Sequence, residues 1–362
     1  MAENLYSKYR PLTFNEVFGH KTIIKEFKKR AKEDSFNQAI LLSSFSGCGK
    51  TTISNIIAKT LLCTHKDEDG NPCNVCENCK SVMFEQNTFS YKMLNASNIG
   101  IDEMRSIEEF ADTETFTLNS RKVIVIDELQ EISGSKAQKN ILKILEKKYK
   151  DVYFILLTMN EGKIDTAIKN RCIPYRLKNL TVEEIAEYLC GVCDREAINI
   201  DTKEKADVLI TIAENSYGSM RTAMSYLERV IYSEIWNKDE VIKELNLISA
   251  EDLSNILNML LSGDINFLSI SFEKEILDRI KYLFVLLYKG LSGIKLNGYE
   301  NAQVSNIRKV ESNILKFALS SIYELNKYSY LTKDLIEFTL INICNFAKDN
   351  VTVKAEPIKR RA

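Results

Sequence analysis

Five short apolar runs, separated by longer stretches of helical periodicity, fill the first half of the chain. Each run is short enough for a buried strand. The runs cover residues 40–42, 89–94, 123–126, 152–157 and 173–177. In the helical stretch 52–62, the apolar side chains that recur on one face are Ile53, Ile56, Ile57 and Leu61. Strands that alternate with helices predict an α/β fold with a parallel, doubly wound sheet of five strands. Such sheets bind ligands at the carboxyl ends of their strands.

From Leu180 onward the chain carries only helical patterns. Thr181 and Glu184 stand at the spacing of a capping box, which predicts the start of the first helix. No group of residues between about 237 and 347 suggests chemistry, so an all-α domain that serves assembly is the simplest interpretation. The last residues, 351–362, have the character of a frayed basic tail.

Composition narrows the class of protein. A chain of 362 residues suggests two or three domains, and 45% hydrophobic with 27% charged residues fits a soluble globular protein. No apolar run approaches the roughly 20 residues of a membrane span, and the N-terminus has no signal-peptide pattern, so we expect a cytoplasmic protein. The formal net charge is −1. Binding to nucleic acid would therefore require a local basic patch or a complex.

Residues 44–51 have the composition of a phosphate-binding loop between a strand and a helix. Gly47 and Gly49 let backbone N–H groups approach a phosphate, and the helix that follows offers the positive end of its dipole. Lys50 would bind the β- and γ-phosphates, and the hydroxyl of Thr51 would bind Mg²⁺. The strict pattern starts with glycine, where this chain has serine. The loop predicts a nucleoside triphosphate site.

Two carboxylates, Asp127 and Glu128, follow the apolar run 123–126. At the end of a buried strand, Asp127 would hold Mg²⁺ and Glu128 would polarise an attacking water. The alternative is a strand that ends in solvated acids. The phosphate loop upstream favours the catalytic interpretation.

Four of the nine cysteines have the spacing of a metal site. They are Cys63, Cys73, Cys76 and Cys79. Without a secretion signal, clustered thiols indicate a reducing compartment and metal binding. Four thiolates satisfy tetrahedral Zn²⁺ with no open position, which predicts a structural zinc site; His65 competes with Cys63 as the fourth ligand. Cys190 and Cys193 lie within a predicted helix without a partner pair, so we expect them not to bind metal.

Two further features have two interpretations each. Residues 9–14 and 16–20 form either an N-terminal arm with turns at Pro11 and Gly19 or a clamp over a nucleotide base. Arg221 follows Gly218 at a helix start, where the helix dipole disfavours a cation. It is therefore either a ligand for an anion or a solvated arginine. Thr158 and Asn160 follow the fourth predicted strand, at the same sheet edge as the acidic pair.

Taken together, these motifs resemble those of the γ/τ subunits of the bacterial DNA polymerase III clamp loader, which are AAA+ ATPases. The resemblance covers the chain to about residue 345. It depends on the motifs Tyr9-Arg-Pro11 with Thr13-Phe14, the phosphate loop with four cysteines directly behind it, Asp127-Glu128, Arg171-Cys172 and Gly218-Ser-Met-Arg221.

The resemblance implies a domain plan. An AAA+ nucleotide-binding domain would span residues 1–178, with a zinc module at 63–79. A small helical lid domain would follow at 179–238. A helical collar for oligomerisation would span 239–347, and the basic tail would span 348–362.

The resemblance also implies a role for each site residue. Arg10 and Pro11 would border the adenine, and the phosphate loop would contribute Gly47, Cys48, Gly49, Lys50, Thr51 and Thr52. Thr51 and Asp127 would hold Mg²⁺. Thr158 or Asn160 would be sensor 1, which detects the γ-phosphate. Arg171 would be an arginine finger for the neighbouring subunit, and Arg221 would be sensor 2.

As a function, the resemblance implies ATP-driven loading of a sliding clamp on primed template DNA by a five-subunit ring. Two alternatives belong to other classes. A non-hydrolysing scaffold subunit is disfavoured by Lys50, Thr51 and the acidic pair. Another AAA+ machine, such as a helicase loader or Holliday-junction motor, is disfavoured by the zinc module and the collar-like helices.

The chain departs from the family pattern at several positions. Ser44 replaces a glycine, Gln130 a histidine and Asn170 a serine, and the loop 98–100 is neutral where the family is basic. The remaining candidates for DNA phosphate contacts are Arg105, Lys136 and Lys139. The chain ends where the shorter form of the family ends, so we expect no polymerase- or helicase-binding extension. These departures fit a divergent member, cellular or phage-encoded.

Overall fold

The computed structural model describes most of the chain in two compact units, Met1–Val241 and Ile242–Ala362. The described residues are 4–113, 121–132, 135–147, 149–245, 247–248, 250–269, 274–295, 304–305, 307, 311–325 and 333–350. The finer boundaries after residues 178, 238 and 347 stay predictions. The predicted basic tail, 351–362, lies outside the described residues.

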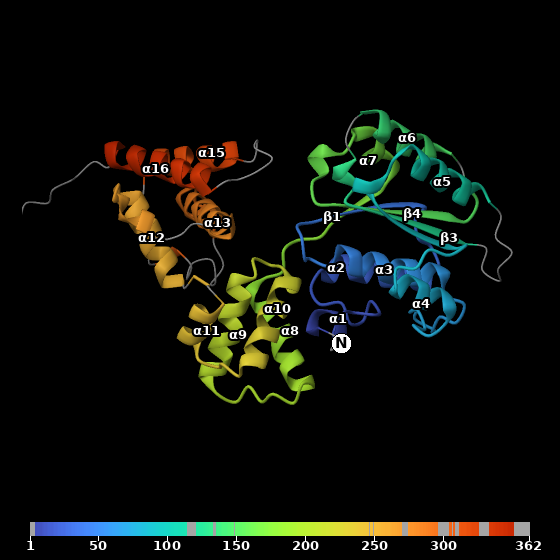
Figure 1. Cartoon of the computed structure of the whole chain (residues 1–362), viewed down its shortest axis with the longest axis horizontal. Coiled ribbons are helices and arrows are strands. Elements are labelled where there is room, and N and C mark those ends of the chain that lie inside the picture. Colours follow the sequence, from blue (N-terminus) through green and yellow to red (C-terminus); the bar gives the residue numbers. More distant parts are fainter. Residues whose placement is uncertain are drawn as a thin grey trace, which may run out of the picture. The chain divides into compact units, whose positions relative to one another are not determined.

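The first unit is built on the parallel five-stranded sheet that the sequence predicts (Figure 1). Its strands are β1 (Ala39–Ser43), β2 (Tyr91–Asn95), β3 (Lys122–Asp127), β4 (Val152–Thr158) and β5 (Ile173–Arg176). Their order is β2-β3-β4-β1-β5, and every neighbouring pair is parallel. The predicted fold class is therefore confirmed. In this order β1 lies between β4 and β5, so the loop after β1 and the end of β4 meet at one sheet edge.

Alternating side chains of each strand supply two cores, one on each face of the sheet. In β1, Ile40 and Leu42 pack with Ile53, whereas Leu41 faces the opposite core with Ile107. The first face is covered by α2 (Lys21–Lys32) and α3 (Lys50–Leu62). The helices of the second face are α5 (Ile101–Asp112), α6 (Ser135–Glu146) and α7 (Thr166–Arg171).

Three details differ from the predictions. Helix α3 is buried on nearly all sides rather than on one face, because sheet, N-terminal arm and cysteine-rich segment surround it. The second strand begins at Tyr91, and Phe89 is 86% exposed. The helical pattern over residues 133–146 predicts Ile141, Leu142 and Leu145 on one buried face. Among the side chains of α6 that the structure describes, Ile141 and Ile144 are buried, whereas Leu142 and Leu145 are half-buried.

Shorter elements and a helical segment complete the first unit. The N-terminal helix α1 (Leu5–Lys8) contacts α10, and α4 (Glu77–Met83) follows the cysteines. The later helices are α8 (Val182–Arg195), α9 (Lys203–Asn215) and α10 (Met220–Ser233), and the boundary between the two units falls within α11 (Lys238–Glu244). The predicted capping box of Thr181 and Glu184 is present at the start of α8, which also contains Cys190 and Cys193 as expected.

The second unit is helical in its described part. Its elements are α12 (Ala250–Ser262), η4 (Ile265–Ser269), α13 (Lys274–Leu291), α15 (Ser312–Leu325) and α16 (Lys333–Asn350). They enclose a separate apolar core, to which Leu257, Phe284 and Leu315 contribute. Phe317 and Phe346 stack with ring centroids 4.0 Å apart. Across the described helices of both units, none is long and apolar enough to cross a membrane.

Candidate nucleotide site and metal site

The phosphate-loop sequence connects the end of β1 to the start of α3. Gly47 and Gly49 adopt left-handed backbone conformations, with φ of 76° and 96°, which glycine adopts at little cost. Gly49 is the N-cap of α3 and Lys50 its first residue. The first-turn N–H groups of α3 are therefore available to an anion.

Lys50 is engaged by the loop itself. Its ammonium donates to the carbonyl oxygens of Ser44 at 2.8 Å and Phe45 at 2.9 Å. The Ser44 hydroxyl accepts a further bond at 3.2 Å. Burial lowers the pKa of Lys50. The serine that replaces the first glycine of the pattern thus gives the lysine an additional acceptor.

The acidic pair lies beside the loop, as predicted from its position after a strand. Asp127 is the last residue of β3, and its Oδ2 lies 3.5 Å from Thr51 Oγ1. A hydroxyl and a carboxylate at this separation fit the oxygen ligands of Mg²⁺. Glu128 has a left-handed backbone with φ of 52°, and its Oε2 accepts a hydrogen bond from Asn95 Nδ2 at 3.4 Å.

These residues converge on a polar cavity of about 470 Å³. Its lining residues are Tyr6, Ser46, Gly47, Gly49, Lys50, Thr51, Thr52, Asp127, Glu128, Met159 and Arg221. A second, mainly apolar cavity of about 560 Å³ shares Tyr6, Gly47, Gly49 and Thr52 with the first and is also lined by Arg10, Pro11, Cys48 and His20. A polar chamber that adjoins an apolar one suits a ligand with an anionic tail and a flat apolar ring.

Tyr6 and His20 have contacts at these cavities that no sequence motif predicts. Tyr6 lines both cavities, and its ring lies 5.1 Å from the guanidinium carbon of Arg221. His20 lines the apolar cavity, and its Nε2 lies 3.0 Å from the carbonyl oxygen of Cys48. Neither residue belongs to a spacing motif. The sequence indicates only that Tyr6 precedes the predicted N-terminal arm and that His20 ends it.

The two sensor 1 candidates differ in environment. Thr158 is fully buried, and its hydroxyl donates to Gln130 Oε1 at 2.9 Å. Asn160 is exposed and caps the 3₁₀ turn η3 (Glu161–Lys163) by accepting from Gly162 N. Neither lines the polar cavity, whereas Met159 between them does. The choice between the two stays open.

Arg171 does not line either cavity of its own chain. It is the last residue of α7, and its guanidinium donates to Glu146 of α6 at 2.8 Å. Its side chain is 52% exposed. This exposure suits a contact with another molecule.

The candidates for DNA contacts have unequal surroundings. Arg105 is exposed on α5, but it lies 3.9 Å from Asp102. The other acids of this short helix are Glu103, Glu108, Glu109 and Asp112. This density of carboxylates disfavours phosphate binding at Arg105. Lys139 on α6 is exposed, and the side chain of Lys136 lies outside the described residues.

The four predicted cysteine ligands come together. The sulfur atoms of Cys63, Cys73, Cys76 and Cys79 all lie within 4.8 Å of one another. Tetrahedral zinc with bonds of about 2.3 Å separates its sulfurs by roughly 3.8 Å, so the cluster fits this ion. Cys63, rather than His65, completes the group: the His65 ring bonds to Thr64, and its backbone N–H donates to Cys63 Sγ at 3.3 Å. Burial raises the pKa of Cys76, but hydrogen bonds from backbone N–H groups outweigh this effect and lower it to about 6.

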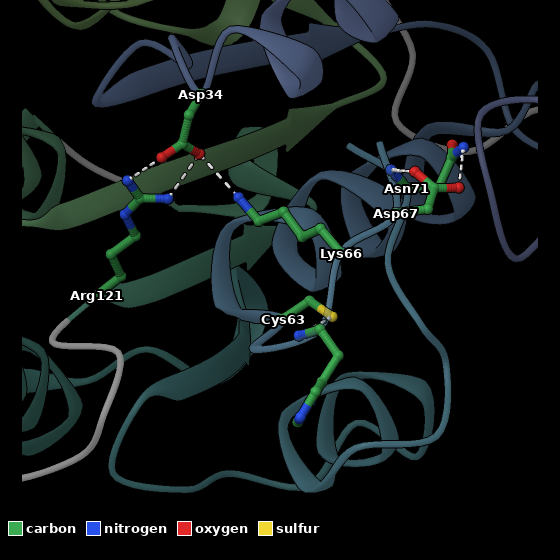
Figure 2. A network of polar contacts seen from close by, with 7 residues as sticks. Asp34, Cys63, Lys66, Asp67, Asn71 and Arg121 are labelled. Carbon is green, nitrogen blue, oxygen red and sulfur yellow. Dashed lines mark hydrogen bonds and ion pairs between the residues drawn. The ribbon is translucent and has the colours of Figure 1, made fainter. Parts of the chain in front are cut away.

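The zinc module, residues 63–79, is fastened to the rest of the domain through Asp34 after α2. Figure 2 shows the Asp34 carboxylate between Arg121 and Lys66, each with a contact of 2.8 Å to Oδ1. Gly70 fits tightly beside α2, because a Cβ there would lie 2.5 Å from the carbonyl carbon of Ala31. The contacts of Asp67 with Asn71 close the intervening loop (Figure 2).

Comparison with known proteins gives relatives along nearly the whole chain. A family model described as DNA polymerase III, delta subunit, matches residues 19–181. DNA polymerase III subunit gamma/tau of Mycoplasma genitalium is 29% identical over 360 residues, which cover 98% of this chain and 57% of that protein. Subunit gamma of Buchnera aphidicola is 29% identical over 342 residues, which cover 90% of this chain and 87% of that protein.

The chain is a relative of the DNA polymerase III γ and γ/τ subunits. The resemblance predicted from the motifs is therefore confirmed. This γ/τ relative also resembles two variants of RuvB from Thermotoga maritima, each with a TM-score of 0.50 at 16% and 15% identity. They cover 90% of this chain and 100% of their own length. At that identity the likeness concerns the fold alone.

Proposed function

We propose that this chain is an ATP-hydrolysing clamp loader subunit that opens a sliding DNA clamp and loads it on primed template DNA. One observation carries the proposal: Lys50, Thr51, Asp127, Glu128 and Arg221 surround a single polar cavity at the carboxyl edge of the sheet. Its similarity to the γ and γ/τ subunits of DNA polymerase III supports a place among the subunits of a replication complex. The sliding clamp, primed DNA and a five-membered ring are part of the proposal.

Within this proposal each polar residue has one task. Lys50 would exchange carbonyl contacts for the β- and γ-phosphates, where its charge offsets charge that develops during cleavage. Thr51 and Asp127 would hold Mg²⁺, which neutralises and orients the phosphates when bound. Glu128 would orient the attacking water and accept its proton. Arg221 would contact the phosphates from the start of α10.

The apolar cavity would hold the adenine ring. Arg10 and Pro11 form part of its wall, and Tyr6 stands where the two cavities meet. Arg171, which lines neither cavity, would reach the nucleotide of a neighbouring subunit. The helical second unit would supply contacts within the ring, and zinc would stabilise the segment 63–79.

Steady-state ATPase assays of the purified chain, alone and in the reconstituted ring, test the proposal. We expect turnover that rises when the cognate clamp and primed DNA are added and that Lys50→Ala abolishes. A chain that supports ring assembly without hydrolysing ATP would be a scaffold subunit. Turnover that responds to a DNA junction and ignores the clamp would indicate another AAA+ motor.

A further inference from the structure

A lysine is buried in the middle of α3. Lys59 is 2% exposed, in a helix that buries both apolar and polar side chains. Its ammonium donates to the carbonyl oxygen of Leu12 at 2.8 Å and to Asn74 Oδ1 at 2.6 Å. A buried ammonium destabilises a fold unless such acceptors replace its water. The buried ammonium therefore favours positions of Leu12 and Asn74 that keep both hydrogen bonds. These two residues belong to segments 62 residues apart in sequence.

The first acceptor belongs to the wall of the apolar cavity. Leu12 directly follows Arg10 and Pro11, which line that cavity. Arg10 is also fixed to α3, because its Nε donates to Thr52 Oγ1 at 3.3 Å. Lys59 thus adds a second hydrogen bond between α3 and this arm. Removing it would take this donor from the Leu12 carbonyl, next to the cavity wall.

The second acceptor belongs to the zinc module. Asn74 lies between the ligands Cys73 and Cys76, with a left-handed backbone at φ of 58°. Metal bonds to these two cysteines would restrict the short segment that contains Asn74. The position of the Asn74 side chain, and hence of the Lys59 ammonium, then depends on the metal.

We propose that Lys59 is a positioning residue that couples zinc binding at the four cysteines to nucleotide binding at the phosphate loop. The inference rests on the proposed nucleotide site. With zinc bound, Asn74 holds Lys59 and Lys59 holds Leu12, so the wall of the apolar cavity is ordered before the nucleotide arrives. Without zinc, part of the free energy of nucleotide binding is used to order this wall. The observed affinity for the nucleotide is therefore lower.

The charge of a zinc–thiolate group would also hold the Lys59 ammonium near the zinc module. A zinc ion with four thiolates carries two net negative charges, which favour a nearby ammonium. Burial lowers the pKa of Lys59 to about 8, opposed by the attraction of Cys79. Loss of the metal would therefore loosen a hydrogen-bond acceptor of Lys59 and remove a favourable field.

Calorimetric titration of the full chain with MgADP tests this coupling. For the wild type, we expect removal of zinc by a chelator to weaken MgADP binding about 10-fold, or about 1.4 kcal/mol. For Lys59→Met, binding to the zinc-loaded chain is about 10-fold weaker, and zinc removal has no further effect. Linkage requires the reciprocal result: saturating MgADP raises the zinc affinity of the wild type about 10-fold and leaves that of Lys59→Met unchanged. If Lys59 only stabilised the fold, Lys59→Met would keep the zinc dependence of MgADP affinity seen in the wild type.

Two further variants keep the test decisive. Asn74→Gly preserves all four thiols and the left-handed backbone, removes the acceptor, and is expected to behave like Lys59→Met. Lys32→Ala removes an exposed ion pair of 3.2 Å with Asp69 of the same module and should retain wild-type coupling.

The outcomes separate this inference from the proposed function. MgADP affinity that is the same with and without zinc overturns the coupling and leaves the motor function standing. The coupling is also overturned if Lys59→Met and Asn74→Gly fold and their MgADP affinity depends on zinc as it does in the wild type. A wild-type chain that binds no MgADP in either state overturns both.

Discussion

Gln130 and Thr158 join the acidic segment to the end of β4 through one hydrogen bond of 2.9 Å. The Thr158 hydroxyl donates to Gln130 Oε1, and the backbone N–H of Met159 donates to the same oxygen at 2.9 Å. Gln130 lies in the 3₁₀ turn η2 (Leu129–Glu131), directly after Glu128. We expect a shift at the end of β4 to be transmitted through Gln130 to Glu128, the residue proposed to orient water.

The variant Gln130→Leu tests this connection. It leaves the Thr158 hydroxyl and the Met159 N–H without their acceptor, which costs on the order of 1–3 kcal/mol. We expect the rate of ATP hydrolysis to fall about 10-fold, the equivalent of about 1.4 kcal/mol, with the nucleotide dissociation constant unchanged. Gln38→Leu removes a bond to the Tyr149 carbonyl at the other end of the sheet and should leave the rate unchanged. Equal losses in both variants would contradict the prediction.

The ring of Tyr6 is expected to hold Arg221 in place. A guanidinium over an aromatic face gains about 0.5–2 kcal/mol, depending on exposure. Tyr6→Leu should therefore weaken ATP binding by roughly 5-fold, about 1 kcal/mol, measured by titration. Tyr6→Phe retains the ring and should bind as the wild type does. If Tyr6→Phe is as weak as Tyr6→Leu, the hydroxyl rather than the ring matters.

Arg171→Ala addresses communication between subunits. We expect intact nucleotide binding but a loss of hydrolysis in the assembled ring that approaches the roughly 10³–10⁵-fold of other arginine fingers. Arg30→Ala is the matched control, because it removes a comparable ion pair, with Glu26, on the opposite face of the sheet. Unchanged turnover of the assembled Arg171→Ala ring would reject the role.

The cysteine cluster predicts one zinc per chain in the purified protein. Metal analysis should show that Cys63→Ser loses the ion and that His65→Ala retains it, because the His65 ring lies outside the sulfur group. Removal of the metal should also lower thermal stability, since metal binding contributes to the free energy of folding. Substoichiometric zinc with four freely titratable thiols would argue against the site.

Asp34 makes the stability of the first unit depend on pH. Hydrogen bonds from Arg121 and Lys66 lower the pKa of its carboxyl from the reference value of 3.8. Such a group stabilises the fold fully above its unfolded-state pKa, and the contribution is lost as the pH falls below that value. Because the carboxylate is partly exposed, we expect Asp34→Asn to reduce the free energy of unfolding by about 1 kcal/mol at neutral pH.

Urea denaturation of wild type and variant across a pH series measures this contribution. The difference between the two chains should stay constant down to about pH 5 and shrink as the pH falls further. Asp69→Asn, which affects an exposed pair with Lys32, should change stability little at any pH. A difference for Asp34→Asn that grows with acidity would refute the assignment.

The sequence predicted those parts of the site that follow from local patterns. The phosphate loop and Asp127 occupy the ends of buried strands, so periodicity alone placed them at the same sheet edge. The four cysteines were predictable because metal geometry restricts their spacing. Tyr6 and His20 follow no such rule, since their positions depend on how the N-terminal arm folds back over the domain.

The burial of Lys59 could not be predicted from the sequence for a different reason. Apolar periodicity assigns a lysine between two buried positions to the solvent side of a helix, and here no such side exists. Helix α3 is covered by the sheet on one side and by the arm and the zinc module elsewhere. Only tertiary contacts, which a helical pattern does not encode, show that this charge is internal.

Position 47 is constrained twice. Its carbonyl oxygen accepts a hydrogen bond from Met220 N at 3.1 Å, and a Cβ there would lie 2.0 Å from Ser219 Oγ. A side chain would therefore displace the turn before α10 as well as crowd a phosphate. If codon 47 were randomised, we expect selection for folding alone to recover glycine. Recovery of glycine in such an experiment would therefore not show that this position is needed for catalysis.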